Sequence, residues 1–252
     1  MLKKLISLTI VTLSFILAAP GARPEPHDTS PDELPRLGVW ITVFSPEKVL
    51  SSKDSVDKLI SNCRSSGIQD IYIQVFRADR AYYDSALTDR SRYEKLLEQA
   101  GEDPLSYLIE RSRESGIKVH AWVNLLSIAQ NLEANILEEH GRNVLTRDQH
   151  GRFPMAIGKK DKLDKYYIRE NQLFLDPGDW RVRKYLSGIV AEIAAKYPGL
   201  AGIHFDYVRY PSAVPFIPGS RFTSHGISYG YNDLNLLNFE KETGLDAKTM
   251  SY

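Results

Sequence analysis

Cysteine is almost absent from this sequence, since Cys63 is the only one among 252 residues. A single thiol excludes an intramolecular disulfide and any zinc site that needs paired cysteines. Cys63 follows Val56, Leu59 and Ile60 at helical spacing. We therefore expect a buried structural thiol and not a reactive one.

Net charge is absent too, because 32 Lys and Arg residues balance 32 Asp and Glu residues. Without a basic excess, the sequence offers no electrostatic reason to bind nucleic acid or anionic lipid. Two catalytic signatures are missing as well. The first apolar strand is followed by "VFSPEK" and not by a glycine-rich phosphate turn, and no Gly-x-Ser-x-Gly elbow occurs. We expect no nucleic-acid partner and no bound cofactor.

A long hydrophobic run stands at the N-terminus, where Lys3 and Lys4 precede Leu5–Ala19 and a few small residues. This layout predicts a secretory signal peptide over residues 1–22. The alternative is an uncleaved membrane anchor, although the run is shorter than the roughly 20 residues that a span requires. We expect export to the periplasm or the extracellular space, with no membrane attachment after cleavage.

The segment that follows, residues 23–35, carries four prolines among charged side chains. Such a composition predicts an extended tether and not a packed element. Folded structure is expected from Arg36 onward, so residues 36–252 form the predicted domain. Its length suits one domain with a large core.

Four short apolar runs predict buried strands, and helical patterns lie between them. The predicted strands are Gly38–Phe44, Asp70–Phe76, Lys118–Asn124 and Ala201–Val208. Asp103 and Asp179 precede two of the helical patterns as candidate N-caps. Strands that alternate with helices predict an α/β fold with a parallel sheet and helical crossovers.

Each predicted strand alternates between an aliphatic and a polar or aromatic parity. Successive side chains point to opposite faces of a sheet. A doubly wound sheet has helices on both faces and needs both parities apolar, whereas a barrel tolerates polar groups inside near its mouth. The sequence thus predicts a (β/α)8 TIM-barrel type fold. The polar or aromatic parity holds Trp40, Thr42, Tyr72, Gln74, His120, Trp122, Asn124, His204 and Asp206.

Only about the first four strand–helix units of such a barrel are visible. Eight units need roughly 250 residues without leader or inserts. We therefore expect the N-terminal half of a barrel, with open sheet edges that favour pairing or aggregation. The oligomeric state is left open by the sequence.

The stretch "GIHFDYVRYP" places an acid at the end of the fourth strand, where barrel enzymes hold catalytic groups. Asp206 is the candidate catalytic carboxylate, flanked by Tyr207 and Tyr210 as candidate substrate contacts. Arg209 would favour the ionised carboxylate and so a nucleophile, base or charge stabiliser. The alternative is a structural carboxylate bonded to Arg209 or to loop amides.

Side chains on the other strands complete the predicted substrate site. The indole of Trp122 offers a flat apolar surface on which a sugar ring can stack, and His120 and Asn124 offer hydrogen bonds. Arg77 and Tyr83 follow the second strand and are predicted to reach the barrel mouth. The alternative for His120 and Trp122 is that they fill the barrel interior, hydrogen-bonded and inert.

A metal site remains as a third possibility. His120, His204 and Asp206 would have to converge inside the barrel, although His204 lies one side-chain layer below Asp206. No paired metal-ligand spacing supports the idea. We expect no metal.

The order of the motifs resembles the glycosyl hydrolase-like family 10 domain across roughly residues 36–245. The motifs are "LGVWITVF", "IYIQVFRADRAYYDS", "GIKVHAWVN", "FLDPGDWRVRKYL" and "GIHFDYVRYP". The resemblance implies an exported bacterial TIM-barrel protein that hydrolyses glycans, with peptidoglycan glycan strands as one candidate substrate. It assigns Asp206 to the acidic position of the strand-four motif. Neighbouring motif positions fall on Arg77, Tyr83, His120, Trp122, Asn124, Tyr207 and Arg209.

These observations predict an exported glycoside hydrolase that acts on a polysaccharide through Asp206. Hydrolysis by two carboxylates needs a second acid, and the sequence shows no convincing one. Two alternatives of other classes stay open. One is a non-catalytic glycan-binding barrel or an inactive truncated relic, and the other is a metal-dependent hydrolase.

Overall fold

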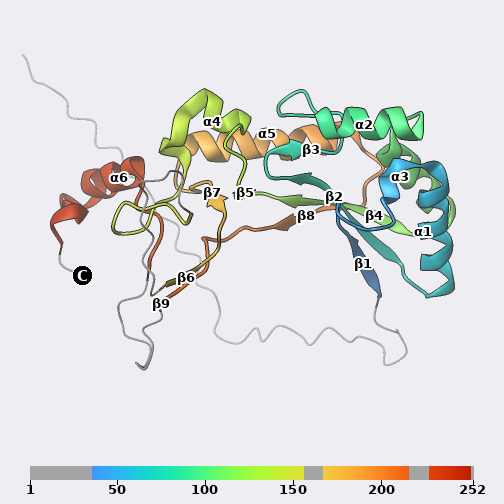
Figure 1. The fold of residues 1–252 in the computed structure, drawn as a ribbon, viewed down its shortest axis with the longest axis horizontal. Coiled ribbons are helices and arrows are strands. Elements are labelled where there is room, and N and C mark those ends of the chain that lie inside the picture. The colour runs from blue at the N-terminus through green and yellow to red at the C-terminus, as the bar shows by residue number, and fades with distance from the viewer. Residues whose placement is uncertain (1–35, 156–166, 216–226, 251–252) are drawn as a thin grey trace, which may run out of the picture. The chain divides into compact units, whose positions relative to one another are not determined.

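A computed structural model of the protein describes residues 36–155, 167–215 and 227–250. The predicted signal peptide and tether lie outside the described residues. The central sheet contains four parallel strands whose order in space follows their order in the sequence, as in a (β/α) barrel (Figure 1). These strands are β1 (Gly38–Ile41), β2 (Asp70–Arg77), β4 (Lys118–Asn124) and β8 (Gly202–Asp206). A short fifth strand, β3 (Arg80–Ala81), pairs antiparallel with the end of β2. All four predicted strands are confirmed.

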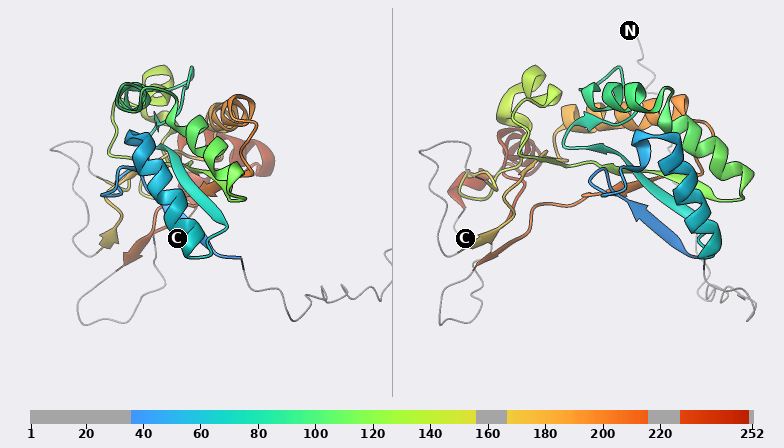
Figure 2. Two further views of the ribbon diagram at one scale, coloured as in Figure 1. Left: turned by 90° about the vertical axis from the view of Figure 1, so that its right-hand side faces the viewer. Right: turned by 45° about the vertical axis from the view of Figure 1, so that its right-hand side comes forward.

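Helices cover one face of this sheet, as Figure 1 and the right panel of Figure 2 both show. They are η1 (Val49–Ser51), α1 (Lys53–Ser65), α2 (Ser91–Ala100), α3 (Pro104–Glu114) and α5 (Trp180–Lys196). Both predicted N-caps are confirmed. Asp103 accepts hydrogen bonds from two backbone amides of α3, and Asp179 accepts one from Arg181 at the start of α5. No helix of the described residues is both long and apolar enough to cross a bilayer.

The hydrophobic core lies between the sheet and these helices. The aliphatic parity of β2 and β4 is buried against α1, α3 and α5, as the alternation predicts. Cys63 is buried in the same cluster, which confirms a structural thiol, and burial raises its pKa. The buried aliphatic members are Ile71, Ile73, Val75, Val119, Ala121 and Val123.

A β-bulge near the end of β2 interrupts this alternation. The register between β2 and β4 shifts between Gln74 and Phe76, so that Phe76 pairs with Val123. Phe76 therefore turns into the core, where it is buried. Arg77 alternates to the other side and lies with its guanidinium over the Phe44 ring, 4.7 Å from the centroid. The bulge thus directs Arg77 away from the helices.

The opposite face of the sheet carries a group of stacked rings. Trp40 stacks on Tyr72 with 4.5 Å between ring centroids, and Tyr72 stacks on His120 at 4.6 Å. His204 meets Trp40 and Tyr72 edge-on. The predicted polar and aromatic parity therefore shares one face, on which Trp40 keeps 53% of its surface exposed.

The outer face of β8 is only partly covered. The alternation of the fourth predicted strand places Ile203 and Phe205 on the side of the helices and predicts that they are buried, but the structure differs at Phe205. Phe205 is 50% exposed and Val208 is 62% exposed. The two side chains line an apolar groove of about 470 Å³ with Leu186 and Val190 of α5. The side chain is on the predicted face, but α5 covers only one flank of the edge strand.

The long inserts after β4 and β8 form smaller elements of their own. A second apolar cluster joins β5 to β7 and to α4. The sequence of the first insert predicts a helical stretch and then a hairpin around "RDQHGRF"; the helix is present as α4, whereas the hairpin is reduced to a turn at Asp148–Gly151 without flanking strands in the described residues. The elements not yet named are β5 (Ser127–Ala129), α4 (Asn135–His140), η2 (Gly141–Val144), β6 (Tyr167–Arg169), β7 (Leu173–Phe174), β9 (Ala213–Pro215), α6 (Asp233–Thr243) and η3 (Ala247–Thr249).

Candidate functional site

Asp206 is the last residue of β8 and lies at the carboxyl end of the parallel sheet. The Trp122 indole Nε1 donates a hydrogen bond to its Oδ2 at 3.0 Å. The backbone N–H of Tyr207 donates to its Oδ1 at 2.7 Å. Tyr207 adopts a left-handed backbone conformation, with φ of 54°. Both carboxylate oxygens are therefore held in place while the side chain stays half-exposed.

Arg209 does not bond to Asp206, which corrects the expected pairing. Its two terminal nitrogens bind the carboxylate of Glu170 at 2.7 and 2.8 Å. The guanidinium also lies over the Tyr207 ring, 4.9 Å from the centroid. Arg209 thereby holds the pKa of Glu170 below its ordinary value, and Glu170 raises that of Arg209. Because β6 and its neighbour Glu170 are far from β8 in the sequence, no local pattern predicts this pair.

We expect the stabilisation from Glu170 to vanish in acid. The folded pKa of Glu170 lies below the ordinary value of 4.5. The ion pair therefore stabilises the fold above about pH 4.5, and the stabilisation is lost as the pH falls through the folded pKa. Urea unfolding of wild type and Glu170→Gln between pH 7 and pH 3 tests this, and their stabilities should converge at the acid end. A difference that stays constant with pH would contradict it.

The three candidate residues of β4 have separate partners. Only Trp122 reaches Asp206. Asn124 is buried and accepts a hydrogen bond from Gln74 at 3.2 Å. His120 bonds through Nε2 to Asp70 at 2.9 Å, near the amino end of the strands. His120 is thus bound inside the ring stack, as the structural alternative expected, and lies away from the carboxyl ends of the strands.

Burial raises the pKa of Asp70, but hydrogen bonds from His120 and Arg36 outweigh it and hold that pKa below its usual range. The Arg36 guanidinium binds Asp70 Oδ2 at 2.7 Å. This carboxylate is therefore an ionised structural anchor at the beginning of β2.

Two predicted tyrosines have different surroundings from those expected. Tyr83 is fully buried and donates a hydrogen bond to Glu192 of α5 at 2.8 Å, so it does not reach the barrel mouth. Tyr210 is 39% exposed. Partial burial, together with the charge of Asp176, raises the pKa of Tyr210 to about 12. Asp176 itself accepts a hydrogen bond from the Gly178 backbone in the turn before α5.

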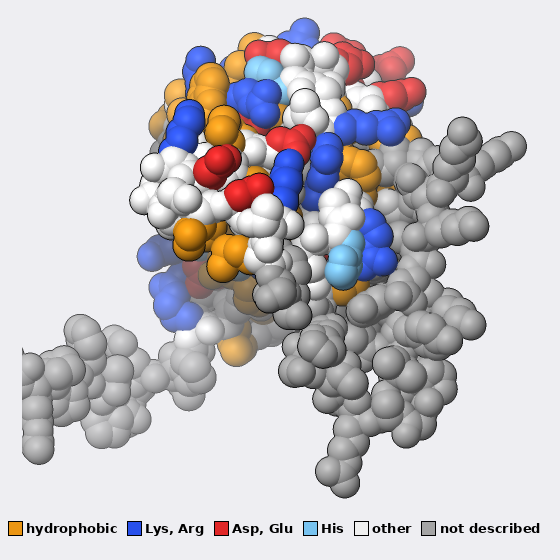
Figure 3. All heavy atoms as spheres, turned by 90° about the vertical axis from the view of Figure 1, so that its left-hand side faces the viewer, with side chains coloured by type: hydrophobic (Ala, Val, Ile, Leu, Met, Phe, Trp, Pro, Cys, Tyr) orange, Lys and Arg blue, Asp and Glu red, His pale blue; other side chains and the backbone are white. Residues whose placement is uncertain are grey.

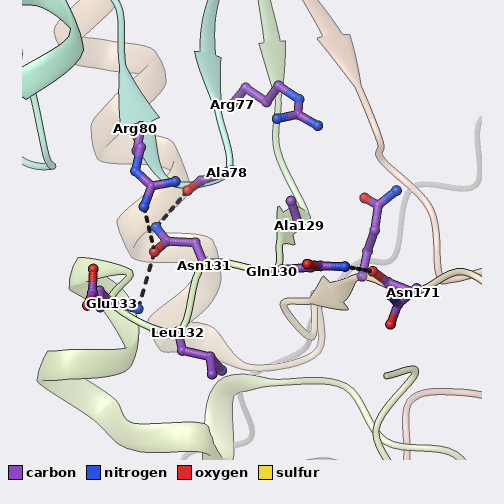
Figure 4. A pocket seen from close by; sticks show the side chains of 10 residues that line it. Arg77, Ala78, Arg80, Ala129, Gln130, Asn131, Leu132, Glu133 and Asn171 are labelled. Atoms are coloured by element: carbon purple, nitrogen blue, oxygen red, sulfur yellow. Dashed lines mark hydrogen bonds between the residues drawn. The ribbon is translucent and has the colours of Figure 1, made fainter. Parts of the chain in front are cut away.

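A groove of about 630 Å³ opens beside the carboxyl ends of β2 and β4 (Figure 4). Amide side chains dominate its wall. Gln130 donates to the Asn171 carbonyl, and Asn131 donates to the Ala78 carbonyl. The lining residues are Arg77, Ala78, Arg80, Ala129, Gln130, Asn131, Leu132, Glu133, Asn171 and Gln172. Of these, only Arg77 was singled out from the sequence. Ala78 and Arg80 follow it in the same motif, and the others lie in the insert after β4, which has no regular pattern.

Backbone strain gathers at the same end of the sheet. Among the described non-glycine residues, five have positive φ, and four of these lie at or directly after the carboxyl end of a strand. Such conformations persist where the surrounding structure enforces them, and they are frequent at functional sites. The four are Ala78, Asp79, Ala129 and Tyr207.

No metal centre is formed by the described residues. They contain no group of three His, Cys, Asp or Glu side chains close enough to hold an ion. His120 and His204 belong to the ring stack, whereas Asp206 bonds to Trp122 one layer further along the strands. The three side chains of the metal alternative therefore do not converge.

The surface around α4 and α6 has no dominant charge. Figure 3 shows Lys and Arg side chains interspersed with Asp and Glu over the described part of this face. A mixed surface agrees with the zero net charge of the chain. Selectivity for a charged ligand on this face must therefore come from individual side chains and not from a surface-wide electrostatic potential.

Comparison with protein families gives a match to the model described as Glycosyl hydrolase-like 10, over residues 36–229. The glycosyl hydrolase DigH of Escherichia coli (strain K12) is 24% identical over 230 residues, covering 84% of this chain and 49% of that protein. The glycosyl hydrolase YngK of Bacillus subtilis (strain 168) is 26% identical over 167 residues, covering 65% of this chain and 29% of that protein. The chain thus spans about half the length of DigH, and less of YngK.

Among solved structures, an alpha-L-fucosidase isoenzyme 2 from Paenibacillus thiaminolyticus superimposes with a TM-score of 0.52. The match covers 85% of this chain and 27% of that one, at 16% sequence identity. At this identity the likeness concerns the fold alone. Together with the strand order, it confirms an α/β fold of the TIM-barrel type.

Proposed function

Because the chain belongs to the glycosyl hydrolase-like 10 family, we propose that it is an exported glycoside hydrolase with Asp206 as a catalytic carboxylate. That the protein is glycoside hydrolase-like follows from the family. The position of Asp206 carries the finer proposal, since it stands at the end of β8 with its oxygens oriented by Trp122 and the Tyr207 backbone. We propose a polysaccharide substrate, with peptidoglycan glycan strands as the first candidate.

The hydrogen bonds to Asp206 suit one of the two roles in glycoside hydrolysis. Both partners donate, so the two carboxylate oxygens act as hydrogen-bond acceptors and are held in fixed directions. Asp206 would therefore attack the anomeric carbon or take a proton from water, while another group protonates the leaving oxygen. Glu170 is unsuited to that second role, because its lowered pKa keeps it ionised beside Arg209.

The groove beside Asn131 suits the recognition of sugar hydroxyls. Amide side chains offer both donors and acceptors at fixed positions. Export rests on the two lysines and the apolar run Leu5–Ala19 at the N-terminus, which have the layout of a signal peptide. The groove lined by amides and the N-terminal sequence are both consistent with a polysaccharide substrate outside the cytoplasm.

One observation favours a second candidate, a glycan-binding domain without catalysis. Both oxygens of Asp206 already accept hydrogen bonds within the protein, as a structural carboxylate would. The same groove would then hold a sugar chain without cleaving it. A hydrolase would produce new reducing ends on the polysaccharide, whereas a binding domain would produce none.

Incubation of the purified chain with peptidoglycan glycan strands and with neutral polysaccharides separates the candidates. We expect shorter fragments with new reducing ends, detected by mass spectrometry. Retention of the protein on the polysaccharide without new ends would support the binding domain and contradict the hydrolase. Neither retention nor cleavage on any substrate would contradict both.

A further inference from the structure

The guanidinium of Arg77 stands out because no carboxylate of the described residues pairs with it. It is half-buried at the end of β2, and its recorded contact is with the Phe44 ring. Arg80, three residues on, is bound by the Asp89 carboxylate at 3.4 Å and by Asn131 Oδ1 at 3.2 Å. In Figure 4 the two arginines point in opposite directions, Arg80 toward Asn131 and Arg77 away from it.

This arrangement leaves the hydrogen-bonding fork of Arg77 available to a ligand. A guanidinium presents five donors in a fixed plane and binds carboxylate or phosphate through two parallel hydrogen bonds. Stacking on Phe44 fixes the plane before a ligand arrives, so less conformational entropy is lost on binding. Arg77 also lines the groove, where an elongated ligand would pass.

The charges around the groove indicate whether Arg77 is better suited to a carboxylate or to a phosphate. Asp89 balances the charge of Arg80, and Glu133 adds a negative charge to the wall. One guanidinium without a carboxylate partner matches a group with a single negative charge. A phosphate monoester carries about −1.5 to −2 at neutral pH and would meet Glu133 with its excess charge. A carboxylate therefore fits better.

We infer that Arg77 binds the carboxylate of an acidic sugar, so that the ligand of the groove is an anionic polysaccharide. The inference rests on the proposed function, since it takes the ligand to be a glycan. It adds the chemical class of that glycan and the residue that distinguishes it from neutral chains.

Binding titrations with the full-length chain test the inference. The probes are a glycan-strand tetrasaccharide with free lactyl carboxylates, its carboxyl-reduced counterpart, and a phosphorylated counterpart of the reduced form. The variants are Arg77→Gln and Arg77→Lys, and the control is Arg92→Gln, which removes one charge from the exposed face of α2. Thermal unfolding checks that each variant is folded.

We expect wild type and Arg92→Gln to bind the carboxylate form about tenfold to a hundredfold more tightly than the reduced form. Arg77→Gln should lose this preference while it still binds the reduced form, and Arg77→Lys should retain part of it. Equal binding of the two forms by wild type, or an undiminished preference in Arg77→Gln, would overturn the inference and leave the proposed function standing. Preference for the phosphorylated form would overturn the assignment to a carboxylate. Failure to bind any probe would contradict the proposed function and the inference together.

Discussion

Replacing Asp206 with Asn is expected to reduce hydrolysis by about 10²–10⁴-fold, or below detection, while the fold remains intact. The amide keeps the shape of the side chain and can still accept from Trp122, but it cannot attack a sugar or take up a proton. Asp206 is half-exposed at a strand end and makes no ion pair with Arg209. The variant should therefore unfold at nearly the wild-type temperature.

The matched control is Asp54→Asn, which removes an exposed carboxylate from the first turn of α1. Its rate of reducing-end release should equal that of wild type. The rate of hydrolysis is measured for all three proteins on the same polysaccharide. Thermal unfolding of the same samples shows whether a lower rate is caused by loss of the folded structure. Wild-type turnover by Asp206→Asn would exclude Asp206 as the catalytic carboxylate. If wild type and Asp206→Asn both bind the glycan and neither cleaves it, the glycan-binding domain is favoured instead.

Truncation of Glu192 to Ala is expected to produce a large loss of stability, of about 3 kcal/mol in the free energy of unfolding. The Glu192 carboxylate accepts from the Tyr83 hydroxyl at 2.8 Å, the Ser85 hydroxyl at 2.6 Å and the Ala86 backbone at 2.6 Å. Its removal leaves three donors without their acceptor, two of them from fully or nearly fully buried residues. It also removes the hydrogen bonds that join the loop after β3 to Glu192, whereas the ion pair of Asp84 with Lys196 at the end of α5 remains.

Urea unfolding followed by circular dichroism measures this loss. Glu98→Ala removes an exposed glutamate from α2 and should change the stability by less than about 0.5 kcal/mol. Tyr83→Phe deletes one donor and should cost about 1 kcal/mol. Ser85→Ala should cost more, because the Ser85 hydroxyl also accepts from the Leu87 and Thr88 amides. A Glu192→Ala protein as stable as the Glu98→Ala control would show that these hydrogen bonds do not hold the loop.

Much of the scaffold could be predicted from local patterns. The period-two alternation of Ile71, Ile73 and Val75 identifies both the strand and its buried face, because neighbouring side chains point to opposite sides of a sheet. Asp103 followed by proline marks a helix start, since its carboxylate satisfies amides that the first turn leaves unpaired. Both features depend on residues within one element.

The partners of the site residues were less predictable. Arg209 lies three positions from Asp206, yet it binds Glu170, which is 39 residues away along the chain. Tyr83 lies six positions after Arg77, the last residue of β2, yet it is buried in the core and its hydroxyl donates to Glu192 of α5. In both cases a long-range hydrogen bond to a carboxylate outweighed sequence proximity.

The sequence by itself determined the four parallel strands, the faces that β2 and β4 bury, the helix caps and the position of Asp206 at a strand end. These follow from side-chain periodicity and capping chemistry, which act over a few residues. Only the tertiary structure decided which polar groups meet. It paired Trp122 with Asp206, joined Arg209 to Glu170, and used a bulge in β2 to direct Arg77 away from the core. The physical reason is that a buried or half-buried polar group takes the nearest suitable partner in space, and that distance is set by the packing of elements far apart in the chain.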